Sequence, residues 1–426
     1  MEPISAWYPV NANQEARLER IRKSRDTGSD WFVHNQLIPV GFQINGPVDV
    51  NRLTQAVDRV ATRHTAFRTV FDWSSTPARQ CVVAELPRLN VLGKVDDDDY
   101  RDRVIMAPMD LKTGPLARFL LLERDGHSEF WICVEHLVAD GWSLDVITRE
   151  IQEAYADPSH LWQPVAIQNH KYGVFENHYC ESDTGRRAKA FWERRLAGGS
   201  PWLALDYPGA GGVEQLNESS ALWEETRLDI GQARLAQASR AGRLTPYVML
   251  LSSMCRAVSR RGGLTVVPVM SPIANRGVAE LESTVTWCSN IMPCAIEMNS
   301  AAGQLDEFRS IRNQLAEFAS FASYPIHRLM RELVPHLWGL ARPTVPFLYF
   351  DVEMSSSEFS LGNTEVEDMT PPTAPIVRGL VIWCRIDEDG LDLQFGCGEG
   401  FLPAAELRSL LGETAEEITK AVAVLT

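Results

Sequence analysis

The chain of 426 residues has no hydrophobic run as long as the roughly 20 residues that a membrane-spanning helix needs. Its longest apolar stretches, 266–270 and 376–384, are interrupted by proline, arginine or glycine. The N-terminus lacks the basic segment followed by an apolar core that a cleaved secretion signal requires. These absences predict a cytoplasmic protein with no membrane partner.

The patterns of metal sites and disulfides are also missing. None of the eight cysteines stands in a Cys-x-x-Cys pair, and several lie inside apolar runs, which predicts buried, reduced thiols. The nine histidines form no cluster with the spacing of metal ligands, so we assign no metal. The net charge of −15 disfavours nucleic acid and anionic membranes, because both are polyanions. We expect a monomer whose partners are small molecules or proteins.

What the sequence does contain is the spacing of a mixed α and β protein. Apolar residues at helical intervals predict a helix over 49–64, with Asp49 as its N-cap. The apolar runs 118–123 and 129–135 flank a turn sequence, which predicts a β-hairpin. Apolar residues after Ser143 trace one face of a second helix, with Ser143 as its predicted N-cap.

The composition changes near the middle of the chain and predicts two domains. Residues 181–212 are rich in basic and small residues and end in a Pro/Gly-rich stretch, so we interpret them as a linker between an N-terminal lobe, 1–180, and a C-terminal lobe, 213–426. In the second lobe a helix is predicted to open at Pro246, where the missing N–H costs nothing. A closing helix is predicted over 404–424, and strands over 265–270, 291–298, 345–350, 376–385 and 391–395.

One segment, HLVADGWS from His136 to Ser143, has residues suited to chemistry. An imidazole at a strand end can take a proton from an attacking amine or hydroxyl near neutral pH. Gly141 is predicted to allow unusual backbone angles, and the following helix offers N–H groups for a developing oxyanion. The parts suit acyl transfer. The structural alternative is that His136 only packs beside a buried strand, and this short pattern does not decide between the two.

In chain order, further segments resemble the core motifs of the condensation domains of nonribosomal peptide synthetases. Segment EHLVADGWS at 135–143 resembles HHxxxDG, except that Glu135 replaces the first histidine. The other matching segments are RHTAFRTVF at 63–71, DLKTGPLAR at 110–118, YGVF at 172–175, FWERRL at 191–196, PIANR at 272–276, SNIMP at 289–293 and VPF at 345–347. The resemblance spans nearly the whole chain.

The resemblance implies an α/β (α+β) fold with two lobes like chloramphenicol acetyltransferase subunits, arranged in a V with the site at their interface. It also implies a stand-alone acyltransferase that moves an acyl or aminoacyl group to an amine or alcohol in natural-product biosynthesis, such as antibiotic biosynthesis. The donor would arrive as a thioester on the phosphopantetheine of an acyl or peptidyl carrier protein. The acceptor would be a small molecule or carrier-bound, and the chain would bind no cofactor itself.

The resemblance also implies roles for individual residues. His136 and Gly141 would be catalytic, the first toward the acceptor and the second toward the thioester carbonyl. Asp140 would be structural and pair with an arginine, Arg276 in first place and Arg63 in second. The substrate tunnel would be lined by Trp142, Ser143, Trp287 and Asn290, although capping or core packing explains each of these equally well.

Other interpretations remain open. Neighbouring residues at a strand end point to opposite sides, so Glu135 is not expected to reach the site that His136 faces. The chain could be an inactive condensation-like domain that docks a carrier protein or recruits another enzyme, or an epimerase of a carrier-bound aminoacyl group. Five basic residues could meet an acidic carrier or simply form a solvated helix face: Arg186, Arg187, Lys189, Arg194 and Arg195.

Overall fold

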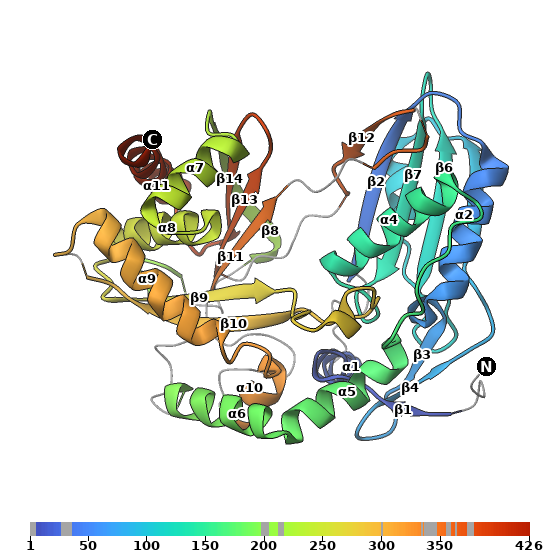
Figure 1. The fold of residues 1–426 in the computed structure, drawn as a ribbon, viewed down its shortest axis with the longest axis horizontal. Helices are drawn as coiled ribbons and strands as arrows, with labels where there is room; N and C mark the ends of the chain where they lie inside the picture. Colours follow the sequence, from blue (N-terminus) through green and yellow to red (C-terminus); the bar gives the residue numbers. More distant parts are fainter. Residues whose placement is uncertain are drawn as a thin grey trace. The chain divides into compact units, whose positions relative to one another are not determined.

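A computed structural model describes residues 6–26, 36–196, 204–211, 217–299, 301–333, 335, 347–354, 359–362, 364–372 and 379–426. The chain divides into two compact units of α and β structure, each described here by itself (Figure 1). Unit 1 consists of Met1–Ser182, Ala274–Ser289 and Ser357–Ala374. Unit 2 consists of Asp183–Ile273, Asn290–Ser356 and Pro375–Thr426. The mixed α/β class predicted from the sequence is confirmed.

Unit 1 is built on a five-stranded sheet with the strand order β12-β2-β7-β6-β5. These strands are Glu365–Met369, Leu37–Asn45, Ser128–Glu135, Ala117–Glu123 and Leu89–Lys94. A small sheet, β1-β4-β3, is formed by Tyr8–Pro9, Arg79–Val82 and Thr69–Asp72. The helices are α1 (Ala12–Asp26), α2 (Val50–Arg63), α3 (Asp98–Ile105), α4 (Gly141–Ala156) and α5 (Asn169–Glu181).

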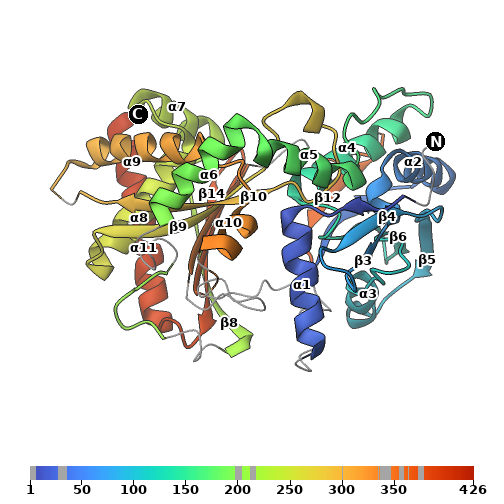
Figure 2. The same ribbon diagram turned by 90° about the horizontal axis from the view of Figure 1, so that it is seen from below.

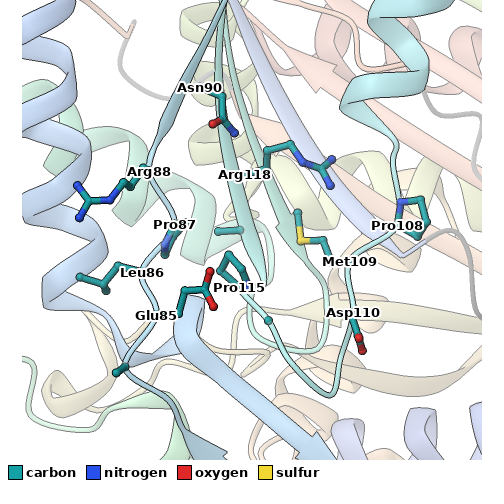
Figure 3. A pocket seen from close by; sticks show the side chains of 13 residues that line it. Glu85, Leu86, Pro87, Arg88, Asn90, Pro108, Met109, Asp110, Pro115 and Arg118 are labelled. Atoms are coloured by element: carbon teal, nitrogen blue, oxygen red, sulfur yellow. The ribbon is translucent and has the colours of Figure 1, made fainter.

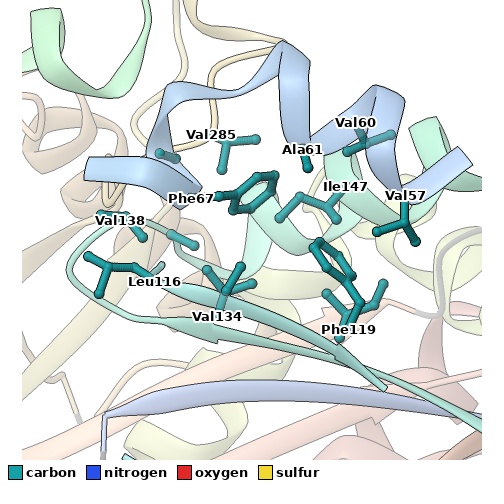
Figure 4. Close-up of a cluster of buried hydrophobic side chains, with 14 of the residues drawn as sticks. Val57, Val60, Ala61, Phe67, Leu116, Phe119, Val134, Val138, Ile147 and Val285 are labelled. Atoms are coloured by element: carbon teal, nitrogen blue, oxygen red, sulfur yellow. The ribbon is translucent and has the colours of Figure 1, made fainter. Parts of the chain in front are cut away.

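Helices α2 and α4 lie side by side and bury apolar side chains against the five-stranded sheet (Figure 4). Val57 and Val60 of α2 meet Phe119 of β6 and Ile147 of α4 in this core. Burial of such residues stabilises the fold by about 1.5–3 kcal/mol per side chain. The end of β7, where the His136 segment begins, is therefore fixed by a packed core on one side of the sheet.

Unit 2 is built on a six-stranded sheet with the strand order β10-β9-β11-β13-β14-β8. These strands are Asn290–Glu297, Val266–Ile273, Phe347–Met354, Gly379–Ile386, Leu391–Glu399 and Asn217–Leu228. Helices α8, α9 and α11 pack on strands of this sheet, and α7 packs on α8 and α11. The helices of unit 2 are α6 (Asp183–Leu196), α7 (Gln232–Gly242), α8 (Pro246–Gly262), α9 (Gln304–Ala319), α10 (Ile326–Leu333) and α11 (Ala404–Leu425).

The units are less contiguous in sequence than we predicted. The predicted linker is wrong over Asp183–Leu196, because these residues form α6, which buries Phe191 and Trp192 in unit 2. Residues 197–203 and 212 of that linker lie outside the described residues. Two segments of the predicted C-terminal lobe belong to unit 1: Ala274–Ser289, which joins β9 to β10, and the segment that carries β12. Strand β12 pairs with β2, so it completes the sheet of unit 1.

Most predicted elements are present with shifted ends. Helix α2 has Asp49 as its N-cap, β6 and β7 form the predicted hairpin, and α8 opens at Pro246 behind the cap Thr245. The predicted N-cap Ser143 is wrong, because Asp140 caps α4 and its carboxylate accepts from the Ser143 N–H. All eight cysteines are free thiols, and each except the half-buried Cys81 is buried. Residues 345, 346 and 376–378 of two predicted strands lie outside the described residues.

Candidate active site

His136 is placed by the last residue pair of β7. Its backbone N–H donates to the Gln36 carbonyl at 2.8 Å, which extends the pairing of β7 with β2 by one step. Its ring nitrogen Nδ1 lies 2.8 Å from the Ala139 carbonyl oxygen. A carbonyl only accepts, so Nδ1 carries the hydrogen and Nε2 keeps its lone pair. Within the described residues Nε2 has no hydrogen-bond partner, and the ring is half-buried.

The surroundings of the ring favour its neutral form. Burial lowers the pKa of His136 below its usual value, and the positive charge of Arg17 acts in the same direction. The hydrogen bond to Ala139 and the charges of Asp140 and Glu135 oppose this without overcoming it. Trp287 lies over the ring, with centroids 4.2 Å apart and planes 30° apart. The imidazole is therefore a fixed, uncharged base at neutral pH.

Asp140 fixes the conformation of the segment 136–143, and both of its carboxylate oxygens accept hydrogen bonds. Its two carboxylate oxygens accept from both terminal nitrogens of Arg276 at 2.9 Å each. They also accept from Ser143 N–H at 3.0 Å and Oγ–H at 2.7 Å, and from the backbone N–H groups of Cys288 at 2.9 Å and Ser289 at 2.8 Å. Asp140 therefore fixes α4 and the segment 274–289 to each other.

The charge of Asp140 is stable in this setting. Burial alone would raise the pKa of Asp140, but the charge and hydrogen bonds of Arg276 and the hydrogen bonds from Ser143 and Ser289 outweigh burial and lower it. The structure therefore contains the ion pair with Arg276 that the sequence suggested first. The second choice, Arg63, is wrong: its Nε bonds both oxygens of Glu150, at 3.0 and 3.1 Å, away from Asp140.

The four predicted tunnel residues have different environments. Ser143 is fully buried and donates to Asp140 and to the Thr286 carbonyl, so it has a structural role. Trp142 is 42% exposed, and its ring N–H donates to the Glu282 carbonyl at 3.0 Å. Trp287 contacts the His136 ring. Asn290 is buried in unit 2, where its amide bonds Ala322, Tyr324 and Ile326 backbone groups.

Gly141 does not have the unusual backbone angles that we predicted, but it is exposed. It is the first residue of α4, and its φ does not lie in the left-handed region. A Cβ built on it would meet no described atom within 4 Å apart from its chain neighbours and the nearby backbone of its own helix. The first backbone N–H groups of a helix have no partner inside the helix. Among the described residues the N–H of Gly141 has no hydrogen-bond partner, and Gly141 is exposed at the positive end of α4.

The sequence analysis missed helix α1, which contacts the residues around His136 and Trp287. Asn11 donates to the Trp287 carbonyl at 3.1 Å, and Gln14 donates to the Leu137 carbonyl at 2.7 Å. Arg17 is buried and forms an ion pair with Glu135. The signal for this was available, because a glutamate predicted to lie at the end of a buried strand requires a cation nearby.

The basic residues of α6 do not form a free positive surface. Arg186 pairs with Asp183, and Lys189 lies 2.8 Å from Glu332. Arg195 lies 2.8 Å from Glu317. Since acidic partners neutralise three of the five cations, the interpretation as a solvated helix face is favoured over a carrier-docking patch.

A cavity of about 640 Å³ in unit 1 contains none of the predicted site residues (Figure 3). Its lining includes Leu86, Arg88, Met109, Asp110 and Arg118. The Arg118 guanidinium is already used, because it donates to the carbonyl of Ala107 at 3.1 and 3.2 Å. The described residues include no group of three or more potential ligands that could hold a metal ion, and none of the described helices is long and apolar enough to cross a membrane.

Comparison with known proteins assigns the family. A family model described as Condensation domain matches residues 6–350, which is most of the chain. The chain belongs to the condensation domain family. The sequence-based identification is thereby confirmed, and the relatives that match this condensation domain include nonribosomal peptide synthetases.

Individual relatives agree with this assignment. Enniatin synthetase of Fusarium oxysporum is 27% identical over 364 residues, which cover 80% of this condensation domain but 11% of the synthetase. The structure of the condensation domain from the monacolin K polyketide synthase MokA superposes with a TM-score of 0.82 at 17% identity, covering 99% of this chain and 98% of that one. A chain in the complex of the X-domain and OxyB from teicoplanin biosynthesis superposes with a TM-score of 0.78 at 19% identity, covering 99% and 94%. At these identities the two superpositions establish the fold.

Proposed function

We propose that this condensation domain is an acyltransferase, which moves an acyl or aminoacyl group from a carrier-protein phosphopantetheine thioester to an amine or alcohol. The observation that carries the proposal is the state of His136. Its Nδ1 is tied to the Ala139 carbonyl at 2.8 Å, its pKa is lowered by burial, and Nε2 has no partner among the described residues. A packing histidine has no need of an unoccupied, uncharged nitrogen, whereas a base or a positioning group for the acceptor does.

In the proposed step the acceptor nitrogen or oxygen attacks the thioester carbonyl and forms a tetrahedral intermediate. Nε2 of His136 takes the proton that the nucleophile loses. Collapse of the intermediate breaks the carbon–sulfur bond, and the proton passes to the departing phosphopantetheine sulfur. The products are an amide or ester and a free thiol, so no oxidant or reductant is needed and the chain supplies no cofactor of its own.

The N-terminus of α4 supports the same proposal. The oxyanion of the intermediate needs hydrogen-bond donors, and the Gly141 N–H at the positive end of α4, which has no partner among the described residues, would be one. Asp140 is not a second base, because Arg276, Ser143 and two backbone N–H groups occupy its oxygens. Its proposed role is to hold the position of α4 beside the His136 loop.

Incubation with a loaded carrier tests the proposal. A phosphopantetheinylated carrier protein bearing an acyl or aminoacyl group is mixed with the chain, with and without an amine or alcohol acceptor, and products are identified by mass spectrometry. New amide or ester only with acceptor supports transfer. Inversion of the aminoacyl centre without acceptor supports epimerisation, and neither product removes the enzymatic proposal. The compartment, the carrier-docking surface and the tunnel between the lobes stay predictions.

The second candidate is a condensation-like domain that binds without catalysis. Trp287 favours it, since the indole lies over the imidazole at 4.2 Å and so occupies one face of the ring. The solved X-domain and OxyB complex is a case in which a protein with this fold binds another protein. In the same assay this candidate predicts carrier binding without product. Replacement of Trp287 by alanine distinguishes the two candidates. If the indole only blocks the His136 ring, the Trp287→Ala variant should form product that the parent does not.

A further inference from the structure

A buried ion pair lies directly behind His136. Arg17 of α1 and Glu135 of β7 are in contact, and their side chains are 1% and 6% exposed. The Glu135 carboxylate also accepts from the backbone N–H of Leu137 at 3.3 Å. The pair therefore joins helix α1 to the two residues on either side of His136 in sequence.

Helix α1 has little freedom to move away from this contact. Leu18 and Ile21 are fully buried in the core of unit 1. At the start of the helix, Gln14 bonds the Leu137 carbonyl at 2.7 Å and Asn13 bonds the Ser289 carbonyl at 2.8 Å. Figure 2 shows the course of helix α1. The charge of Arg17 is consequently held at a fixed place relative to the imidazole.

The charges near His136 come from three elements and one loop. Glu135 of β7 and Asp140 at the cap of α4 carry negative charge, and Arg17 of α1 carries positive charge. Arg276, from the segment 274–289, neutralises Asp140 through two hydrogen bonds of 2.9 Å. Glu135 pairs with Arg17, and the half-buried Arg20 of the same helix adds a second positive charge beside Arg17.

We propose that the Arg17–Glu135 pair is a positioning and charge-balancing device, which controls the charge state of His136 and holds the back of its loop. Glu135 stands where the family motif has its first histidine, and a neutral imidazole there would leave Arg17 as an uncompensated buried cation. The glutamate cancels that charge. The catalytic consequence rests on the proposed function, whereas the effect on the His136 proton does not.

The two charges have opposite effects on an imidazolium at position 136. Glu135→Gln leaves the Arg17 cation unbalanced, which disfavours a second positive charge. Arg17→Gln leaves the Glu135 anion unbalanced, which favours it. In a medium of intermediate effective dielectric, removal of one charge within several ångströms shifts a titration midpoint by about one pH unit. In the double variant the two effects cancel.

An NMR titration of the labelled His136 ring tests this, with the signal assigned by its loss in His136→Ala. We expect the midpoint to fall in Glu135→Gln, to rise in Arg17→Gln, and to return to the parent value in the double variant. Shifts of the same sign, or no shift in either variant, overturn the proposal. If the single variants do not fold, Glu135→His restores the residue of the family motif, and its midpoint must fall; an unchanged midpoint overturns the proposal in the same way.

Activity is measured in parallel so that the two proposals fail separately. If acyl transfer occurs, the rising limb of kcat/KM against pH must move with the NMR midpoint in each variant. Opposite midpoint shifts without any acyl transfer would retain the charge-balancing device and reject the proposed function. Acyl transfer with a pH profile that neither substitution shifts would retain the proposed function and reject the charge-balancing device. Arg17→Lys, which keeps the charge, is the matched control and should titrate like the parent.

Discussion

Unit 1 and unit 2 each bury an arginine against carboxylates, but they use it differently. In unit 2, Arg256 of α8 contacts Glu307 of α9 and Glu417 of α11, so it clamps three regular helices. In unit 1, Arg276 contacts Asp140. The Asp140 carboxylate also accepts hydrogen bonds from the backbone N–H groups of Cys288 and Ser289, which lie outside the helices and strands. The first cluster stabilises elements that already have internal hydrogen bonds. The second gives a defined shape to a loop that has few of its own.

The two clusters should therefore respond differently to the loss of one partner. Loss of Arg256 should release helices without changing any reacting group, whereas loss of the Asp140–Arg276 pair should displace the segment that carries Trp287.

The largest effect is expected at the ring itself. His136→Ala should lower kcat/KM for acyl transfer by roughly 10²–10⁴-fold, the usual contribution of a general base, with little change in melting temperature. The matched control is His127→Ala, because His127 lies in the turn before the same strand, at its opposite end. Parent-level activity in His136→Ala would remove this residue from the mechanism.

The two ion pairs are compared directly by Asp140→Ala and Arg256→Ala. Each leaves a buried charge without its partner, so each should lower the free energy of unfolding by about 3–5 kcal/mol. Denaturant unfolding measures this. Only Asp140→Ala should also lower kcat/KM per folded molecule, by tenfold or more. Equal activity losses in both variants would show that the contrast between the units is false.

The pH profile follows from the lowered pKa of His136. Protonation of Nε2 removes the base, so kcat/KM should rise with pH through a midpoint below the usual value of about 6.5 and then level off. One pH unit below that midpoint the rate should be about tenfold lower. A midpoint above 6.5, measured from initial rates across the pH range, would contradict the assigned environment of the ring.

Two exposed glycines, Gly141 at the start of α4 and Gly412 inside α11, separate substrate contact from fold. A Cβ built on Gly141 in α4 or on Gly412 in α11 meets no described atom within 4 Å outside its chain neighbours and the nearby backbone of its own helix. Alanine at either position should leave stability unchanged or raise it by up to about 1 kcal/mol. If the thioester passes Gly141, Gly141→Ala should still lower kcat/KM by about tenfold, while Gly412→Ala retains full activity. Thermal melts and steady-state rates measure both.

The smallest effect is expected on α6. Arg194 is exposed there, but its cationic neighbours are mostly paired with acidic residues. Arg194→Glu should change the apparent KM for the carrier by less than about twofold, because a single exposed charge contributes little. The control is Lys420→Glu on α11. A large rise in KM for Arg194→Glu alone would restore the carrier-docking interpretation of α6.

The features that could be predicted are those that depend on residues close together in the sequence. We correctly inferred the Asp49 cap of α2, the start of α8 at Pro246, the hairpin before His136 and the pairing of Asp140 with arginine. The exchange of roles between Asp140 and Ser143 was not, because both residue types cap helices well and a local pattern cannot choose between them.

Other parts of the site depend on distant segments and were not visible. Helix α1 has few apolar residues and many charged ones, so its periodicity gave no helical signal. Its polar side chains act only through contacts with residues more than 100 positions away, such as the Gln14 bond to Leu137. Asn290 was grouped with the tunnel because it is close to Trp287 in sequence, yet the boundary between the units falls between Ser289 and Asn290.

The order in which the chain is synthesised gives the segment 274–289 a further consequence. A nascent polypeptide that has reached Ser182 contains His136 and Asp140, but the ribosome has not yet made Arg276 or Trp287. Asp140 must then stay hydrated until almost a hundred more residues have emerged, and β2 waits still longer for β12. The His136 loop is consequently among the last parts of unit 1 to assemble during translation, and expression of 1–182 alone should yield an aggregation-prone fragment.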